Sequence, residues 1–181
     1  NWAAMDVVGQ AMSGMIAMTK VKDCPPARIG TSVIDMSAAL YAALITSTLY
    51  LSGIRGVKVE VNMLGAGLMY MGYWLIYTQL KGREPEPPGT GLQAWAPYGL
   101  FRTKDDKWIF IGIVSDKHWV DFCKALGLKD LLRDKKYERN EGRVAFKDEL
   151  ETRVATVLMS YSRAVSYTHL RAHETEADIV C

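Results

Sequence analysis

The stretch Pro25-Pro-Ala-Arg-Ile-Gly-Thr-Ser-Val-Ile-Asp-Met-Ser-Ala-Ala-Leu-Tyr-Ala-Ala-Leu44 holds a single carboxylate, Asp35, among small and apolar residues. Burying an unpaired carboxylate is costly, so we expect Asp35 to cap a helix, to pair with another group or to carry out chemistry. The Ala- and Leu-rich run from Met36 to Leu51 predicts a helix, which makes Asp35 its expected N-cap. A poorly solvated carboxylate at a helix start is also suited to act as a covalent nucleophile.

Three segments around this helix complete the first part of the chain. Asp6 to Met18 predicts a helix, Val57 to Val61 alternates with the period of a strand, and Met63 to Leu80 predicts a second long apolar helix. Its tyrosines and Trp74 recur at helical spacing, which is typical of core packing. The Pro- and Gly-rich segment 82–92 follows and predicts a linker between a domain over 1–81 and a second one.

The part of the chain after the linker has a different pattern. Tyr98–Arg102 and Trp108–Val114 predict strands of a hairpin, joined by the polar turn Lys104–Lys107. Asp116–Leu126 and Glu141–Ser160 predict amphipathic helices. In the second helix the apolar residues that fall along one face are Val144, Phe146, Leu150, Val154 and Leu158. We therefore expect a small α+β domain over 93–164.

Composition narrows the classes of function. A net charge of +2 over 181 residues is too small to predict a nucleic-acid partner. The three cysteines have no C-x-x-C spacing, which predicts no disulfide framework, no metal site and a reducing, cytoplasmic location. His118 has no partner at metal-ligand spacing, and the common phosphate-loop, dinucleotide, serine-hydrolase and zinc-protease motifs are absent from the sequence.

Two uncharged runs raise the alternative of a membrane hairpin. Val61 to Leu80 carries no charge over about the length that spans a bilayer. The run before it contains Asp35, which is costly in lipid, and a helix that is apolar all round is also typical of a buried core helix. We expect no membrane partner, and the hairpin remains the alternative from another class of protein.

Four segments in order resemble one known family. DVVGQAMSG at Asp6–Gly14, CPPARIGTSVIDMSAALYAALITSTLY at Cys24–Tyr50, VKVEVNMLGAG at Val57–Gly67 and APYGLFRTKDDKWIFIGIVSDKHWVDFCKALGL at Ala96–Leu128 are similar to the middle of a family III CoA-transferase. This family includes formyl-CoA, carnitine and bile-acid CoA-transferases. The resemblance runs from about Met5 to about Leu158.

The resemblance implies a fold and a set of site residues. The implied fold is α/β, with part of a Rossmann-like large domain plus a small α+β domain, and the complete protein forms an interlocked homodimer. Asp35 matches the catalytic aspartate, which forms a mixed anhydride and then an aspartyl-CoA thioester while CoA passes from an acyl-CoA to a small carboxylic acid. Arg28, in the turn Pro-Pro-x-Arg-x-Gly, and Met63, which matches a residue of the CoA adenine pocket, are the implied CoA-binding residues.

A sister branch of the same fold gives a second alternative. The α-methylacyl-CoA racemases use the matching aspartate together with a histidine, and Met5 stands where that histidine is expected. Moving a proton from one face of a carbon to the other needs a second acid-base group. The sequence therefore favours the transferase over the racemase.

Both ends of the chain are unusual. The chain begins with Asn1 directly on a helical pattern, which predicts a fragment of a longer protein. The tail 165–181 resembles translated sequencing-adapter DNA that recurs at the ends of assembled genes, and we expect it to be foreign to the protein. His169, His173 and Cys181 are for that reason excluded from functional interpretation.

Overall fold

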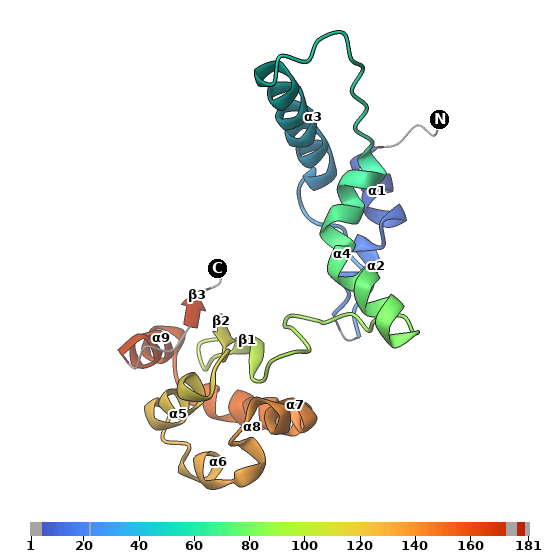
Figure 1. The fold of residues 1–181 in the computed structure, drawn as a ribbon. Coiled ribbons are helices and arrows are strands. Elements are labelled where there is room, and N and C mark those ends of the chain that lie inside the picture. The colour runs from blue at the N-terminus through green and yellow to red at the C-terminus, as the bar shows by residue number, and fades with distance from the viewer. Residues whose placement is uncertain (1–4, 22, 173–176, 180–181) are drawn as a thin grey trace. The chain divides into compact units, whose positions relative to one another are not determined.

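The chain folds into two compact units, Asn1–Gly89 and Thr90–Cys181, in a computed structural model that describes residues 5–21, 23–172 and 177–179 (Figure 1). The division falls inside the predicted 82–92 linker. That the two units are parts of a large and a small domain stays a prediction.

The first unit is helical. It contains α1 (Asp6–Met12), α2 (Met15–Met18), α3 (Val33–Leu51) and α4 (Met63–Lys81). The single helix predicted over Asp6–Met18 is wrong, because Gly14 takes a left-handed φ of 83° and separates α1 from α2. Glycine has no Cβ, so it adopts this conformation at little cost.

Helix α3 begins three residues earlier than the apolar run predicts. Its N-cap is Ser32 and its first residue is Val33, so Asp35 lies inside the first turn. The prediction that Asp35 is the N-cap is therefore wrong. The Ser32 side chain makes no capping hydrogen bond either, so another residue must accept the free N–H groups of this turn.

The connection from α3 to α4 is extended but unpaired. Val57–Val61 was expected as a strand, and the structure assigns none there. Alternation favours an extended backbone, but a strand also needs a neighbour to form its ladder, and the described residues provide none for this segment. Asn62 ends the connection as the N-cap of α4, where its side chain accepts a hydrogen bond of 2.6 Å from the Gly65 N–H.

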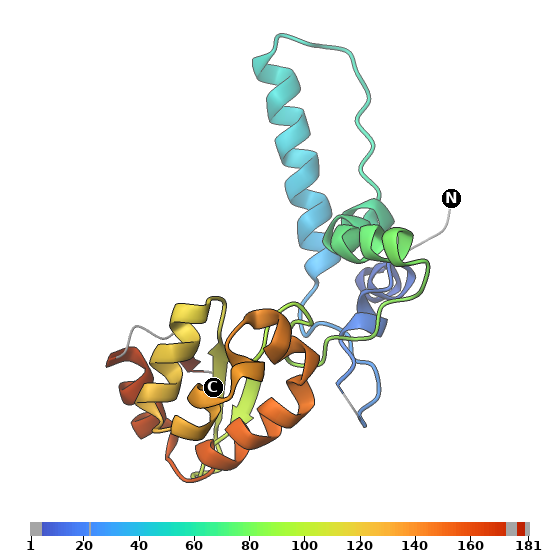
Figure 2. The same ribbon diagram turned by 60° about the horizontal axis from the view of Figure 1, so that its bottom comes forward.

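The core of the first unit is small. Its buried cluster consists of Met15 in α2, Ile34 at the start of α3 and Met71 in the middle of α4. Gly67 allows a close approach there, since a Cβ at this position would lie 2.8 Å from the Ser13 Cβ. The rest of α3 extends away from α1, α2 and α4, and an extended segment leads from its far end back to α4, as Figures 1 and 2 both show.

Most apolar side chains of the long helices are exposed. Leu40 is 69% exposed and Leu51 is 84% exposed. Tyr70 and Tyr73 are 52% and 63% exposed, whereas Trp74 packs against the small core, so the prediction that the α4 aromatic residues pack in a core holds for Trp74 and is wrong for these two tyrosines. Within the described residues, these two helices lack the cover that their composition requires.

The second unit is built on an antiparallel sheet. Strands β1 (Tyr98–Arg102) and β2 (Trp108–Gly112) form the predicted hairpin, with Leu100 opposite Phe110, and β3 (Ala177–Ile179) pairs with the other edge of β2. The turn residue Asp106 has a positive φ of 61°, a conformation that Asp adopts more readily than most residues.

Helices pack around this hairpin, as Figure 2 shows. They are α5 (Asp116–Ala125), α6 (Lys129–Arg133), the 3-10 turn η1 (Lys135–Tyr137), α7 (Asn140–Ala145), α8 (Lys147–Leu158) and α9 (Arg163–Ala172). The helix predicted over Glu141–Ser160 is divided at Phe146, which is 46% exposed rather than buried. Leu150, Val154 and Leu158 are fully buried, as predicted.

The core of the second unit is continuous. Ile109 and Ile111 of β2 join Trp119 and Phe122 of α5, the buried residues of α8, and Leu170 of α9 in one cluster. The predicted tail 165–181 therefore includes a helix that contributes to this core. Its foreign origin stays a prediction, and His173, Cys181 and the side chain of His169 lie outside the described residues.

A buried arginine in α7 links separate segments of this unit. The fully buried Arg143 donates from Nε to the Ala96 carbonyl at 3.0 Å and from Nη2 to Asp116 Oδ1 at 2.9 Å. Its guanidinium also lies 5.4 Å from the centre of the Trp119 ring. Burial acts to raise the pKa of Asp116, but hydrogen bonds from Arg143 and Arg139 outweigh it and lower that pKa.

Candidate functional site

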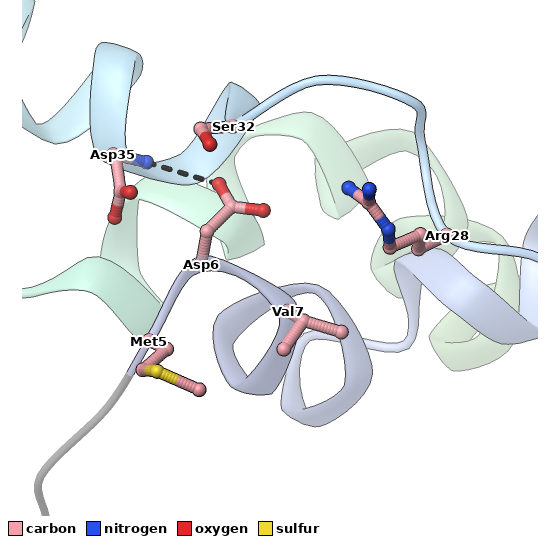
Figure 3. Close-up of a pocket in the computed structure, with 6 residues that line it drawn as sticks. All are labelled: Met5, Asp6, Val7, Arg28, Ser32 and Asp35. Carbon is pink, nitrogen blue, oxygen red and sulfur yellow. Dashed lines mark hydrogen bonds between the residues drawn. The ribbon is translucent and has the colours of Figure 1, made fainter.

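An open hollow of about 540 Å³ lies in the first unit where α1 meets the start of α3. Its lining residues come from three places in the chain: Met5, Asp6, Val7, Arg28, Ser32 and Asp35 (Figure 3). The structure thus brings together Asp35 and Arg28, two of the three predicted site residues. The third, Met63, does not line the hollow.

Asp35 presents a free carboxylate to this hollow. Its side chain is exposed, contrary to the apolar burial expected from the sequence. No described residue donates a hydrogen bond to its carboxylate or forms an ion pair with it. The backbone N–H of Asp35, in contrast, is held, because it donates to Asp6 Oδ2 at 3.2 Å. The backbone of Asp35 is therefore held in place, while its carboxylate has no hydrogen-bond partner among the described residues.

Asp6 is the residue that caps α3, and the sequence did not identify it as a site residue. Its Oδ2 accepts hydrogen bonds from the backbone N–H groups of Ile34, at 2.7 Å, and Asp35. These are two of the donors that a helix start leaves without an intrahelical partner. A negative charge at this end of α3 is also favoured by the helix dipole.

Gln10 completes this arrangement from the next turn of α1. Its Nε2 donates to Asp6 Oδ1 at 2.5 Å and to the Thr31 carbonyl at 3.3 Å, while its Oε1 accepts from the Ile29 N–H at 2.8 Å. Gln10 is fully buried, and Asp6 nearly so. The two side chains fix the backbone before α3 and the first turn of α3 to one face of α1.

Arg28 contributes the positive charge at the edge of the hollow. Its side chain is exposed and its Nη1 donates to the Ile29 carbonyl at 3.2 Å. In the view of Figure 3 the Arg28 guanidinium and the Asp35 carboxylate lie on opposite sides of Asp6. The guanidinium retains donors for a phosphate or a carboxylate, which it binds with good geometry.

Met63 packs in the small core of the first unit. It is the first residue of α4, is half-buried, and packs against the cluster of Met15, Ile34 and Met71. Its predicted contact with the CoA adenine stays a prediction.

Other groups in the described residues offer less chemistry. Burial raises the pKa of the Cys123 thiol to about 12, so this cysteine stays protonated and is a poor nucleophile. No three His, Cys, Asp or Glu side chains within the described part of the chain could hold a metal ion. Among the same residues, α3 is the one helix that is long and apolar enough to cross a membrane, which is weak evidence for a span and does not supply the pair that a hairpin needs.

The sequence did contain a signal for the residues that were missed. Asp6 and Gln10 are four positions apart on a predicted helix, a spacing that places two polar side chains side by side. Polar residues on the buried side of such a helix need partners, and the nearest polar backbone is the start of another helix. Which helix start they bind is decided only by the tertiary fold.

Comparisons with known proteins agree with this fold. The model of CoA-transferase family III matches residues 1–180. Succinyl-CoA–D-citramalate CoA-transferase of Chloroflexus aurantiacus is 29% identical over 88% of this chain, and succinyl-CoA:glutarate CoA-transferase of Mus musculus is 30% identical over 82%. Two solved structures, a CAIB/BAIF family protein from Brucella suis and a protein from Mycobacterium tuberculosis, superpose with TM-scores of 0.81 and 0.83 at 20% and 21% identity, each over 99% of this chain.

The chain belongs to CoA-transferase family III, and the predicted family and fold are confirmed. It spans 40% of the length of the Chloroflexus relative, 34% of the mouse relative and 48% of each of these two solved chains.

Proposed function

We propose that the protein transfers coenzyme A from an acyl-CoA donor to a carboxylic acid acceptor, with Asp35 as the covalent nucleophile. The observation that carries this proposal is the exposed Asp35 carboxylate, which has no partner among the described residues and lies on a fixed helix turn at a hollow that Arg28 also lines. Membership of a family of CoA-transferases supports it, as do the two relatives named above, which are transferases for D-citramalate and glutarate.

The reaction proceeds in four balanced steps. The Asp35 carboxylate attacks the thioester carbonyl, the C–S bond breaks, and CoA thiolate leaves an acyl-aspartyl anhydride. The thiolate then attacks the aspartyl carbonyl of the anhydride, which releases the donor acid and leaves an aspartyl-CoA thioester. The acceptor carboxylate attacks this thioester, the C–S bond breaks, and CoA thiolate leaves a second anhydride. The thiolate finally attacks the acceptor carbonyl of this anhydride. Acceptor-CoA leaves and the Asp35 carboxylate is restored without net proton transfer.

Arg28 is proposed to bind an anionic part of the substrates. Its guanidinium is exposed at the edge of the hollow that Asp35 lines. The phosphate groups of acyl-CoA and the carboxylate of the acceptor are each suitable partners for bidentate hydrogen bonds from a guanidinium. Met63 is retained as a proposed CoA contact, on the family resemblance alone.

The described residues that line this hollow do not provide the second acid-base group that the racemase alternative needs. Met5 has no acid-base function, and the Asp6 carboxylate is already occupied by Gln10 and two backbone N–H groups. Exchange of the α-hydrogen of a 2-methylacyl-CoA with deuterated water, at a rate comparable with CoA transfer, would favour the racemase instead.

The complete protein is further proposed to be a cytoplasmic homodimer. The exposed apolar side chains of α3 and α4, such as Leu40 and Leu51, support an assembly that covers them. Light scattering of the whole protein tests this, and a monomer at micromolar concentration would contradict it.

The decisive experiment traps the Asp35 intermediate. The whole protein, with any sequence that precedes and follows this chain, is incubated with succinyl-CoA and hydroxylamine, which converts an activated aspartyl group to a hydroxamate that mass spectrometry locates. We expect the label on Asp35, and we expect Asp35→Asn to lower CoA transfer by at least about 10⁴-fold. Asp23→Asn changes an exposed carboxylate outside the hollow and provides the control, with activity expected within about twofold.

Label on another residue, or transfer that persists in Asp35→Asn, would show that Asp35 is not the nucleophile.

A further inference from the structure

We propose that Asp6 is a positioning residue that keeps the Asp35 carboxylate available for attack. The inference rests on the proposed function of Asp35 and concerns how the chain holds that carboxylate. It starts from an unusual feature of α3: the cap of this helix comes from a residue 29 positions away and on a different helix.

The donors at the start of α3 are all occupied. Val33 N–H donates to the Thr31 carbonyl at 2.9 Å, and the N–H groups of Ile34 and Asp35 donate to Asp6. The next N–H, that of Met36, donates to the Ser32 carbonyl at 3.0 Å and begins the regular helix. No free donor is left in the first turn.

This occupation has a consequence for the side chain of Asp35. A carboxylate in the first turn of a helix is stabilised by the free N–H groups and by the positive end of the helix dipole, and it readily folds back onto them. A carboxylate that is bound in this way is a weaker nucleophile, because its charge is already shared. Because Asp6 accepts from these N–H groups, no backbone donor of the first turn is left to bind the Asp35 carboxylate.

The same contacts make the Asp6 carboxylate a poor nucleophile. Its Oδ1 accepts from Gln10 and its Oδ2 from two N–H groups, and the side chain is almost fully buried. The hollow thus contains two carboxylates with different tasks. One is bound and holds the backbone, while the other is exposed and reacts. Only Asp35 is expected to carry the hydroxamate label.

The test measures acylation of Asp35 in the whole protein after changes at Asp6. Asp6→Ala removes the acceptor, and we expect the rate constant for acylation per active site to fall about 10- to 100-fold. The KM for succinyl-CoA is expected to stay within about threefold, since Asp6 is occupied by the protein and is not expected to bind substrate. Glu60→Ala changes an exposed carboxylate on the α3–α4 connection and is the control, with unchanged acylation expected.

A rescue separates positioning from a general effect on folding. The double variant Asp6→Asn with Gln10→Glu exchanges the charged and the amide side chain. Asn oxygen then accepts from the start of α3, its amide donates to the new Glu, and that Glu still accepts from the Ile29 N–H, although the Thr31 carbonyl loses its donor. We expect acylation to return to within about fivefold of the original rate.

Amide hydrogen exchange gives a readout that does not depend on activity. In Asp6→Ala the N–H groups of Ile34 and Asp35 lose their acceptor, and we expect them to exchange at least about tenfold faster. The Met36 N–H is the internal reference and should change less.

The outcomes distinguish this inference from the function on which it rests. Normal acylation of Asp35 in Asp6→Ala, or unchanged exchange at Ile34 and Asp35, overturns the positioning role while the nucleophile stands. Absence of any acyl-Asp35 in the unchanged protein overturns the proposed function and the inference together.

Discussion

The two units of this chain reach their folds in different ways. The second unit surrounds its hairpin with helices and buries a continuous core that includes Ile109, Trp119 and Leu150. The first unit has two long apolar helices but buries only a small cluster around Ile34, and the hydrogen bonds of Asp6 and Gln10 hold α1 to the start of α3. Apolar sequence alone therefore does not make a core, since each face also needs a partner.

The largest expected effect concerns the cores themselves. Leu150→Ala empties a fully buried position in the second unit and should lower its free energy of unfolding by about 3 kcal/mol. Leu40→Ala changes a leucine on the open face of α3 and should cost less than about 0.5 kcal/mol. Urea titrations of the chain, followed by circular dichroism, compare the two variants. Equal losses would mean that the open face of α3 is covered in solution.

Buried charge gives the next comparison, within the second unit. Arg143→Met removes a fully buried guanidinium that pairs with the partly exposed Asp116, and it leaves the Ala96 carbonyl without its donor, so we expect a loss of about 2 kcal/mol in the free energy of unfolding. Arg139 binds the same Asp116 carboxylate from an exposed position, and Arg139→Met should cost less than about 1 kcal/mol. The same urea titration measures both variants. Similar losses would contradict the view that the contacts of Arg143 stabilise this unit more than those of Arg139.

The smallest effect is expected on the loss of thermal stability at acid pH. The Arg163 N–H and the Thr103 hydroxyl donate to Asp105 and lower the pKa of that carboxyl to about 2. The folded pKa lies below the ordinary value of 3.8, so the stabilisation is present above about pH 4 and is lost as the pH falls toward 2. We expect the melting temperature to fall less between pH 5 and pH 3 in Asp105→Asn than in the unchanged chain.

Asp106→Asn is the control for this measurement, because Asp106 is its exposed neighbour in the same turn. Glu151 acts in the opposite direction, since burial raises its pKa and favours its protonated form in the folded state. An Asp105→Asn variant with the same acid dependence as the unchanged chain would show that these hydrogen bonds do not stabilise the fold.

Local patterns predicted the elements whose stabilising contacts are close in sequence. The β1–β2 hairpin follows from alternation on both sides of a short polar turn, and α3 and α4 follow from their apolar runs. Asp35 and Arg28 were found through a resemblance to a family, and the structure places both at one hollow.

The failures have a common physical cause. Val57–Val61 forms no ladder because a strand depends on a neighbour that local sequence does not specify. Asp35 is not the cap because Asp6, far away in the chain, occupies the donors first. The break at Gly14 is local, but a glycine within an apolar run indicates a helix end only weakly.

The side chain of Gln10 also bears on which substitutions the chain can accept. Both of its contacts before α3 are to backbone atoms, the Thr31 carbonyl and the Ile29 N–H. Every residue supplies such a carbonyl, and every residue except proline supplies such an N–H. The Gln10 contacts therefore do not restrict the Thr31 side chain. Ile29 also packs against the core cluster of this unit, and proline at position 29 would in addition remove a hydrogen-bond donor.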